Sequence, residues 1–168
     1  MGHRDSTDAD VIPILDAPSA VRVPSQALVR SAALGRVGVV LVSQSRDLAE
    51  DVADLARAVA PTDDPAPVAA TGGHPSDGLG SSALLIAAAA RRVDQGHGVV
   101  VLADLPAAVH TVQALLATAD EHGLPFPVRF ADAPFVEGAV AAVLTASAGG
   151  DLAAVLDAAE EMYRQGKV

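Results

Sequence analysis

The feature that most constrains the fold is a nearly continuous apolar run over residues 37–43, VGVVLVS. A run without polar alternation is typical of a strand buried on both faces, as occurs in parallel sheets covered by helices. The segment that follows, residues 47–60, repeats apolar residues at helical spacing and predicts an amphipathic helix. We expect the inward face of this helix to consist of Leu48, Val52, Leu55 and Val59.

The same alternation of apolar strands and helices continues along the chain. It predicts an α/β fold with three layers, α/β/α, in which the middle layer is a mainly parallel sheet of four to five strands. Because 51% of the residues are apolar but only 2% are aromatic, the core must be built from alanine, valine and leucine. The further strands are expected at residues 68–71, 98–103 and 128–131, and the further helices at 82–93, 107–122, 136–146 and from Leu152 onward, with Asp151 as N-cap.

The chain divides into two unequal parts by composition. Residues 1–35 mix aspartates and prolines without a persistent period, apart from one short stretch, residues 25–34, that suits a helix. We expect these residues to form a disordered or loosely packed N-terminal extension. Residues 36–168 carry the strand–helix pattern and are expected to form the single domain.

Charge and composition exclude several classes of function. A formal net charge of -10 argues against binding to nucleic acid and to anionic membranes. The chain has no cysteine, which excludes disulfides and thiolate chemistry. Its start lacks the apolar stretch of a signal peptide, and its longest apolar run, residues 83–90, is far shorter than the roughly 20 residues of a membrane span. We expect a cytoplasmic protein that uses no metal ion or cofactor.

Three polar loops follow three of the expected strands. Ser43-Gln44-Ser45 follows the first strand, a glycine-rich loop over residues 72–81 follows the second, and Asp104 opens the loop after the third. In open α/β sheets, ligands bind at the carboxyl ends of the strands. If the first strand is central, these loops lie side by side and form the functional site.

Four phrases of the sequence, in the same order, resemble one protein family. They are LVSQSRDLAEDVADLA, TGGHPSDGLGSS, VVVLADLPAAVHT and APFVEGAVAAVLTASAGGDL, and together they span residues 37–168. They resemble the mannose-type enzyme IIA fold of the phosphotransferase system (PTS). Within that fold they are most similar to the phosphotransferase subunit of PTS-dependent dihydroxyacetone kinases.

The resemblance implies a role in phosphoryl transfer. Members of the family take a phosphoryl group from the phosphocarrier HPr onto a histidine nitrogen. They pass it to ADP bound to the nucleotide-binding subunit of the kinase, and they are typically homodimers. The implied partners are therefore a second copy of the chain, an HPr-like phosphocarrier and that kinase subunit.

The resemblance breaks at Gln44, which stands where the family has its phospho-accepting histidine. A neutral imidazole offers a lone pair to phosphorus, whereas the lone pair of a carboxamide nitrogen is delocalised into the carbonyl group. Four explanations remain open: an error in the sequence, a loss of phosphotransfer with partner binding retained, a takeover by another residue, and a different function. His74, in the glycine-rich loop, is the candidate for a takeover, although Pro75 restrains its backbone.

The resemblance also assigns roles to the neighbouring residues. Asp104 occupies the acidic position beside the phosphohistidine, where it would orient an imidazole or, here, accept a hydrogen bond from the amide of Gln44. An equal alternative is that Asp104 caps the helix that begins near Pro106. Ser81 is either a site residue or a helix cap. The residues expected to bind phosphate or a partner are Ser43, Ser45, Gly72, Gly73 and Ser81.

These observations predict a phosphotransferase-family subunit whose own phosphotransfer is impaired. Pro106 supports this prediction, because the family usually has a glycine there and proline removes an N–H donor. The alternative is a regulatory or scaffold protein of the same fold that binds kinase or PTS partners without chemistry. A nucleotide-binding role is disfavoured, because the loop GGHPSDGLG lacks the Walker lysine and the GxGxxG spacing.

Overall fold

The computed structural model describes residues 35–73 and 80–165. Strands and helices alternate through both ranges, as the sequence predicts. Of the expected sites, His74 lies outside the described residues, as does the expected N-terminal extension up to residue 34. The elements are β1 (Gly38–Ser43), α2 (Arg46–Val59), β2 (Val68–Gly72), α3 (Ala83–Val93), β3 (Val99–Ala103), α4 (Pro106–Ala117), the 3-10 helix η1 (Ala119–His122), β4 (Val128–Phe130), α5 (Phe135–Ser147) and α6 (Leu152–Glu161).

The described strands form one parallel sheet in the order β2-β1-β3-β4. β1 lies between β2 and β3, so the loops that follow these strands meet at the same edge. The register places Ser43 opposite Gly72 and Val42 opposite Ala103. The predictions of a parallel α/β sheet and of adjacent loops at its carboxyl edge are therefore confirmed.

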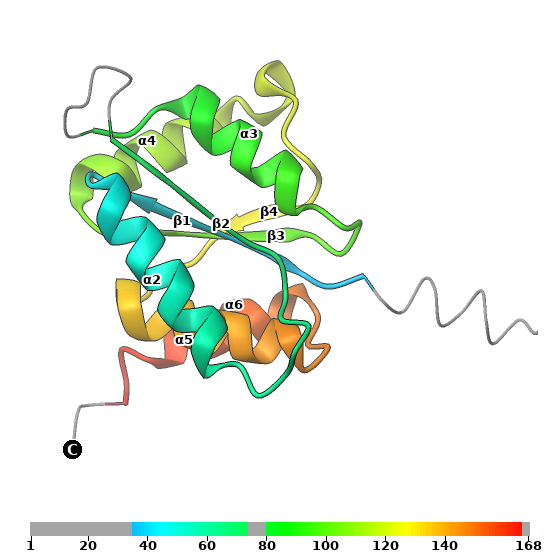
Figure 1. Ribbon diagram of the computed structural model, residues 1–168. Coiled ribbons are helices and arrows are strands. Elements are labelled where there is room, and N and C mark those ends of the chain that lie inside the picture. Colours follow the sequence, from blue (N-terminus) through cyan, green and yellow to red (C-terminus); the bar gives the residue numbers. More distant parts are fainter. Residues whose placement is uncertain (1–34, 74–79, 166–168) are drawn as a thin grey trace, which may run out of the picture. The chain divides into compact units, whose positions relative to one another are not determined.

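Helices cover both faces of the sheet (Figure 1). Helices α3 and α4 lie on one face and α2, α5 and α6 on the other. Alternate residues of β1 enter the two cores: Val39 and Leu41 pack toward α2, α5 and α6, whereas Val40 and Val42 pack toward α3 and α4. Because both faces are covered, the unbroken apolar run of β1 is buried along its whole length.

The inward face of α2 differs from the prediction. Leu48, Leu55 and Val59 are 42%, 45% and 48% exposed, and only Val52 of the predicted face is buried. Alanine side chains let the helix lie close to the strands, and the larger leucines are displaced to its flanks. The buried residues of α2 are Ala49, Val52, Ala53 and Ala56.

The second half of the chain follows the prediction more closely. The helix expected over residues 107–122 is divided into α4, which ends at Ala117, and η1, which ends at His122. Gly123 follows η1 with a left-handed φ of 59°. Asp151 caps α6 as predicted, and its carboxylate accepts a hydrogen bond from the Ala154 N–H at 2.9 Å. No helix within residues 35–73 and 80–165 is both long and apolar enough to cross a lipid bilayer.

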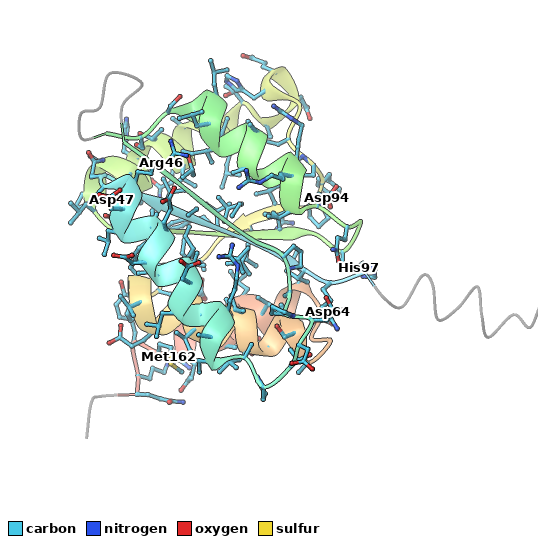
Figure 2. All side chains as sticks on the ribbon, in the orientation of Figure 1. Arg46, Asp47, Asp64, Asp94, His97 and Met162 are labelled. Carbon is cyan, nitrogen blue, oxygen red and sulfur yellow. The ribbon has the colours of Figure 1, made fainter. Side chains whose placement is uncertain are left out.

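The two ends of the sheet carry different residues (Figure 2). Arg46 and Asp47 mark the first turn of α2 at the carboxyl end of the strands, whereas Asp94 and His97 lie at the amino end, before β3. His97 is therefore remote from the loops at the carboxyl end of the strands.

Candidate functional site

The site is built on Ser43, the last residue of β1. Its side chain is completely buried, although it ends in a hydroxyl group. The Ser43 Oγ donates a hydrogen bond to Asp104 Oδ2 at 2.5 Å and accepts one from the Ser45 N–H at 2.9 Å. A buried hydroxyl whose donor and acceptor capacity is both used has little freedom to reorient. Ser43 therefore joins the loop after β1 to the loop after β3.

Asp104 is the centre of the hydrogen-bond network at this edge. Besides Ser43, its carboxylate accepts from the Leu105 N–H at 2.7 Å and from the Gln44 N–H at 3.3 Å to each oxygen. Its own N–H donates to the Val42 carbonyl at 3.1 Å. Charge-assisted hydrogen bonds of this kind are stronger than those between neutral groups. Asp104 thus holds the backbone of both loops.

Two expectations for Asp104 are corrected by these contacts. The N-cap of α4 is Leu105, and no side chain caps this helix, so Asp104 is not the cap residue. The carboxylate also receives the main-chain N–H of Gln44 and not its side-chain amide. The physical reason is position, because Asp104 comes directly after β3 and lies level with the backbone of the β1 loop.

Gln44 lies at the tip of the loop and is half-buried. Its main chain is held on both sides, since its N–H donates to Asp104 and its carbonyl accepts from the Gly80 N–H at 3.0 Å. Its side chain forms no hydrogen bond with any residue of the described ranges. The structure therefore fixes this position through its backbone and not through the carboxamide.

Helix α2 begins directly after this loop. Ser45 is its N-cap, and the Ser45 Oγ accepts from the Leu48 N–H at 3.4 Å. The free N–H groups and the dipole of a helix N-terminus favour an anion nearby. Arg46 is exposed and pairs with Glu50 at 2.8 Å, and this hydrogen bond raises the pKa of Arg46 above its usual value.

The residues after β2 complete the site from the other side. A side chain at Gly72 would collide with the Ser43 carbonyl oxygen, so glycine is required for this close approach. Gly73 has a left-handed φ of 73°. The Ser81 Oγ donates to Thr111 Oγ1 of α4 at 2.9 Å, and the N-cap of α3 is Ser82, so Ser81 does not cap that helix.

The structure therefore brings most of the predicted residues to one edge of the sheet. Ser43, Gln44, Ser45, Gly72 and Asp104 surround the end of β1, whereas Ser81 is turned toward α4. In the part of the chain that the structure describes, no three acidic or histidine side chains gather as ligands for a metal ion. At this edge, polar side chains and main-chain N–H groups surround the half-buried carboxylate of Asp104.

Sequence reasoning missed the roles of Gly80 and Thr111. Gly80 holds the carbonyl of Gln44, and the Thr111 Oγ1 links Ser81 to the Ala107 carbonyl at 3.0 Å. The hydrogen bond of Thr111 could have been expected, because in a helix a threonine hydroxyl can donate to the main-chain carbonyl four residues earlier, here that of Ala107. The role of Gly80 depends on a main-chain contact, which no side-chain pattern reveals.

Comparisons with known proteins agree with this geometry. The EIIA-man family, described as the PTS system fructose IIA component, matches residues 38–156, which include the sheet and the loops of the site. Two curated relatives are phosphoryl donor subunits DhaM of PEP-dependent dihydroxyacetone kinase. The one from Escherichia coli K12 is 33% identical over 122 residues, 71% of this chain, and the one from Pantoea ananatis is 33% identical over 125 residues, 73% of this chain.

The extent of these matches differs between the relatives. The aligned regions are 25% and 26% of the two DhaM proteins, so the chain spans about a quarter of their length. A solved structure, described as unknown function protein EF1359, matches 79% of this chain and 97% of its own, with a TM-score of 0.61 and 25% identity. The sequence match, the sheet order and the loops at its carboxyl edge lead to one conclusion: the chain belongs to the EIIA-man family of PTS IIA components.

Proposed function

We propose that this protein is a DhaM-like domain that retains the docking surface of a phosphoryl donor subunit but does not itself carry the phosphoryl group. The family role would be to relay phosphoryl groups from an HPr-like phosphocarrier to ADP on the nucleotide-binding subunit of a dihydroxyacetone kinase. Its partners would be these two proteins and a second copy of the chain. The two DhaM relatives are phosphoryl donor subunits of a dihydroxyacetone kinase, which supports this choice of partners.

The observation that carries the proposal is that an amide side chain stands at position 44, on a backbone held by hydrogen bonds. The backbone of Gln44 is held by Asp104 and Gly80, and Gln44 directly precedes Ser45, the N-cap of α2. An anionic group delivered there would meet the helix dipole and the carboxamide donor. The carboxamide cannot form the covalent bond to phosphorus that an imidazole forms. The site therefore suits recognition of a phosphorylated partner more than phosphorylation.

Replacing Gln44 with histidine tests whether only the acceptor is missing. We expect no labelling of the natural chain by phosphoenolpyruvate, enzyme I and HPr, and stoichiometric labelling of Gln44→His. Because the hydrogen bonds at position 44 run through the main chain, the new imidazole can be introduced without losing them. Labelling is measured by the added phosphate mass and by its acid lability, which is characteristic of a phosphoramidate. Gln44→Asn, which retains an amide, is the matched control and should stay unlabelled.

Three other outcomes each overturn part of the proposal. Labelling of the natural chain that survives in Gln44→Ala and disappears in His74→Ala would show that another histidine has taken over. Phosphate found on the side chain at position 44 of the natural protein would refute the loss of phosphotransfer. A Gln44→His variant that folds but stays unlabelled would refute the retained docking surface. In that last case a regulatory or scaffold role without PTS contact becomes the better interpretation.

A further inference from the structure

A second concave site lies beside the Gln44 loop, on the other side of Asp104. It is a depression of about 540 Å³ between the carboxyl ends of β3 and β4 and the helices α4 and α5. Small-molecule sites commonly have volumes of roughly 300–1,000 Å³. The depression is lined by Ala103, Asp104, Pro106, Val109, His110, Gln113, Phe130, Asp132, Ala133, Pro134, Phe135 and Tyr163.

The depression gathers nearly all the aromatic side chains of the protein. The chain has three phenylalanines, one tyrosine and no tryptophan. Phe130 of β4, Phe135 at the start of α5 and Tyr163 after α6 all line the depression. Phe130 and Phe135 are half-buried and each packs against one of the two cores, whereas Tyr163 is exposed. The three rings come from different parts of the chain and together give the depression an aromatic lining.

The charged groups of the depression are negative. Asp104 and Asp132 line it, and none of its lining residues is a lysine or an arginine. The Tyr163 hydroxyl lies 3.5 Å from Asp132 Oδ1, so a ring and a carboxylate adjoin each other. Pro106, at the first position of α4, has no N–H group to offer an anion. Carboxylates and the negative faces of aromatic rings attract cations and repel phosphate.

We propose that this depression binds an alkylammonium or guanidinium group together with its short apolar stem. The cationic head would lie against Asp132 and the rings of Phe135 and Tyr163, and the stem would contact Val109 and Ala133. Such contacts combine charge attraction, cation–π attraction and burial of methylene groups. The depression shares Asp104 with the Gln44 loop, but its other lining residues belong to β3, β4, α4, α5 and the segments that follow β4 and α6. The proposal does not depend on the function proposed above.

Tyr163 provides a direct readout of binding. It is the chain's only tyrosine, and the chain lacks tryptophan, so intrinsic tyrosine fluorescence reports on this depression alone. The probes are n-butylguanidinium and its neutral isostere n-butylurea, titrated in the same buffer. We expect a saturable fluorescence change with the cation and a much weaker one with the urea. Proton NMR of the rings of Phe130, Phe135 and Tyr163 gives a second, independent measurement.

Two variants separate charge from shape. Asp132→Asn retains the shape and removes one carboxylate, and we expect about five- to tenfold weaker binding of n-butylguanidinium. Phe135→Leu retains an apolar side chain and removes the ring, and a loss of about twofold to fivefold is expected. Asp51→Asn, on the exposed side of α2, is the matched control and should leave the affinity unchanged.

The origin of the cation is tested with a capped Gly-Arg-Gly peptide. Equal affinities for the peptide and for n-butylguanidinium would assign the site to a free small cation, and a much tighter peptide would assign it to an arginine side chain of a protein partner. Both results support a cation site. The proposal is overturned if n-butylurea binds as tightly as the cation, if Asp132→Asn binds as well as Asp51→Asn, or if neither fluorescence nor the ring resonances respond to any probe.

Discussion

The Gln44 loop and the depression lined by aromatic residues share Asp104 but consist of different chemical groups. In the loop, a buried hydroxyl, a carboxylate and main-chain N–H groups satisfy one another, and Gly72 lets the strands approach closely. In the depression, rings and carboxylates face an open volume, and Asp132 and Tyr163 are exposed. The comparison separates two uses of polar groups: those in the loop stabilise the fold, whereas those in the depression remain available for binding.

The strongest test of this difference is Asp104→Ala. It removes the acceptor of the Ser43 hydroxyl, which is completely buried, and of the N–H groups of Gln44 and Leu105. Leaving buried donors without an acceptor costs about 1–3 kcal/mol, and we expect a loss of about 2–3 kcal/mol because several donors are affected together. The measurement is the free energy of unfolding from urea denaturation.

Asp132→Ala is the control for this prediction, because it removes the same kind of group, a carboxylate, from the depression and leaves the Gln44 loop unchanged. Asp132 is exposed, so its loss should change the free energy of unfolding by no more than about 0.5 kcal/mol. Equal destabilisation by the two variants would contradict the distinction between a stabilising loop and an available depression.

The fold could be predicted from the sequence because the strands are easy to recognise as unbroken apolar runs. Unbroken apolar runs such as that of β1 require cover on both faces, and this requirement leads to a parallel sheet with helices on each side. The face of α2 could not be predicted in the same way. Leu48, Leu55 and Val59 are among the more hydrophobic residues of α2, yet alanines of this helix face the sheet. The reason is that all the helices on one face together determine how far each of them lies from the sheet, and the sequence of one helix does not reveal this distance.

The site could be predicted only in part, for a related reason. The positions of Ser43, Gln44, Gly72 and Asp104 follow from their places after adjacent strands, and the structure brings them together. The hydrogen-bond pattern of Asp104 could not be predicted, because it depends on the direction of main-chain N–H groups in the folded loops. The aromatic depression was also missed, because its rings are separated along the chain and show no common motif.

Ser43→Ala is the next test of the loop and should have an intermediate effect. The substitution removes one methyl-sized polar group, which donates to Asp104 and accepts from the Ser45 N–H. Alanine fits the space, so no steric strain is expected, and the loss should be about 1–2 kcal/mol in the free energy of unfolding. Because Ser43 and Asp104 belong to one network, the double variant should lose less than the sum of the two single variants. Strict additivity in the same urea denaturation would show that the two residues act independently.

Substitutions at Gln44 should have the smallest effect on stability and so test the loop most finely. The hydrogen bonds of Gln44 to Asp104 and Gly80 run through its main chain, so Gln44→Ala removes none of them. We expect a change within about 0.5 kcal/mol in the free energy of unfolding, as for a surface side chain. Gln44→Pro removes the N–H that faces the carboxylate and should cost at least about 1 kcal/mol more. If Gln44→Ala were as destabilising as the proline variant, the carboxamide would be part of the stabilising network and would no longer be available to bind a phosphorylated partner.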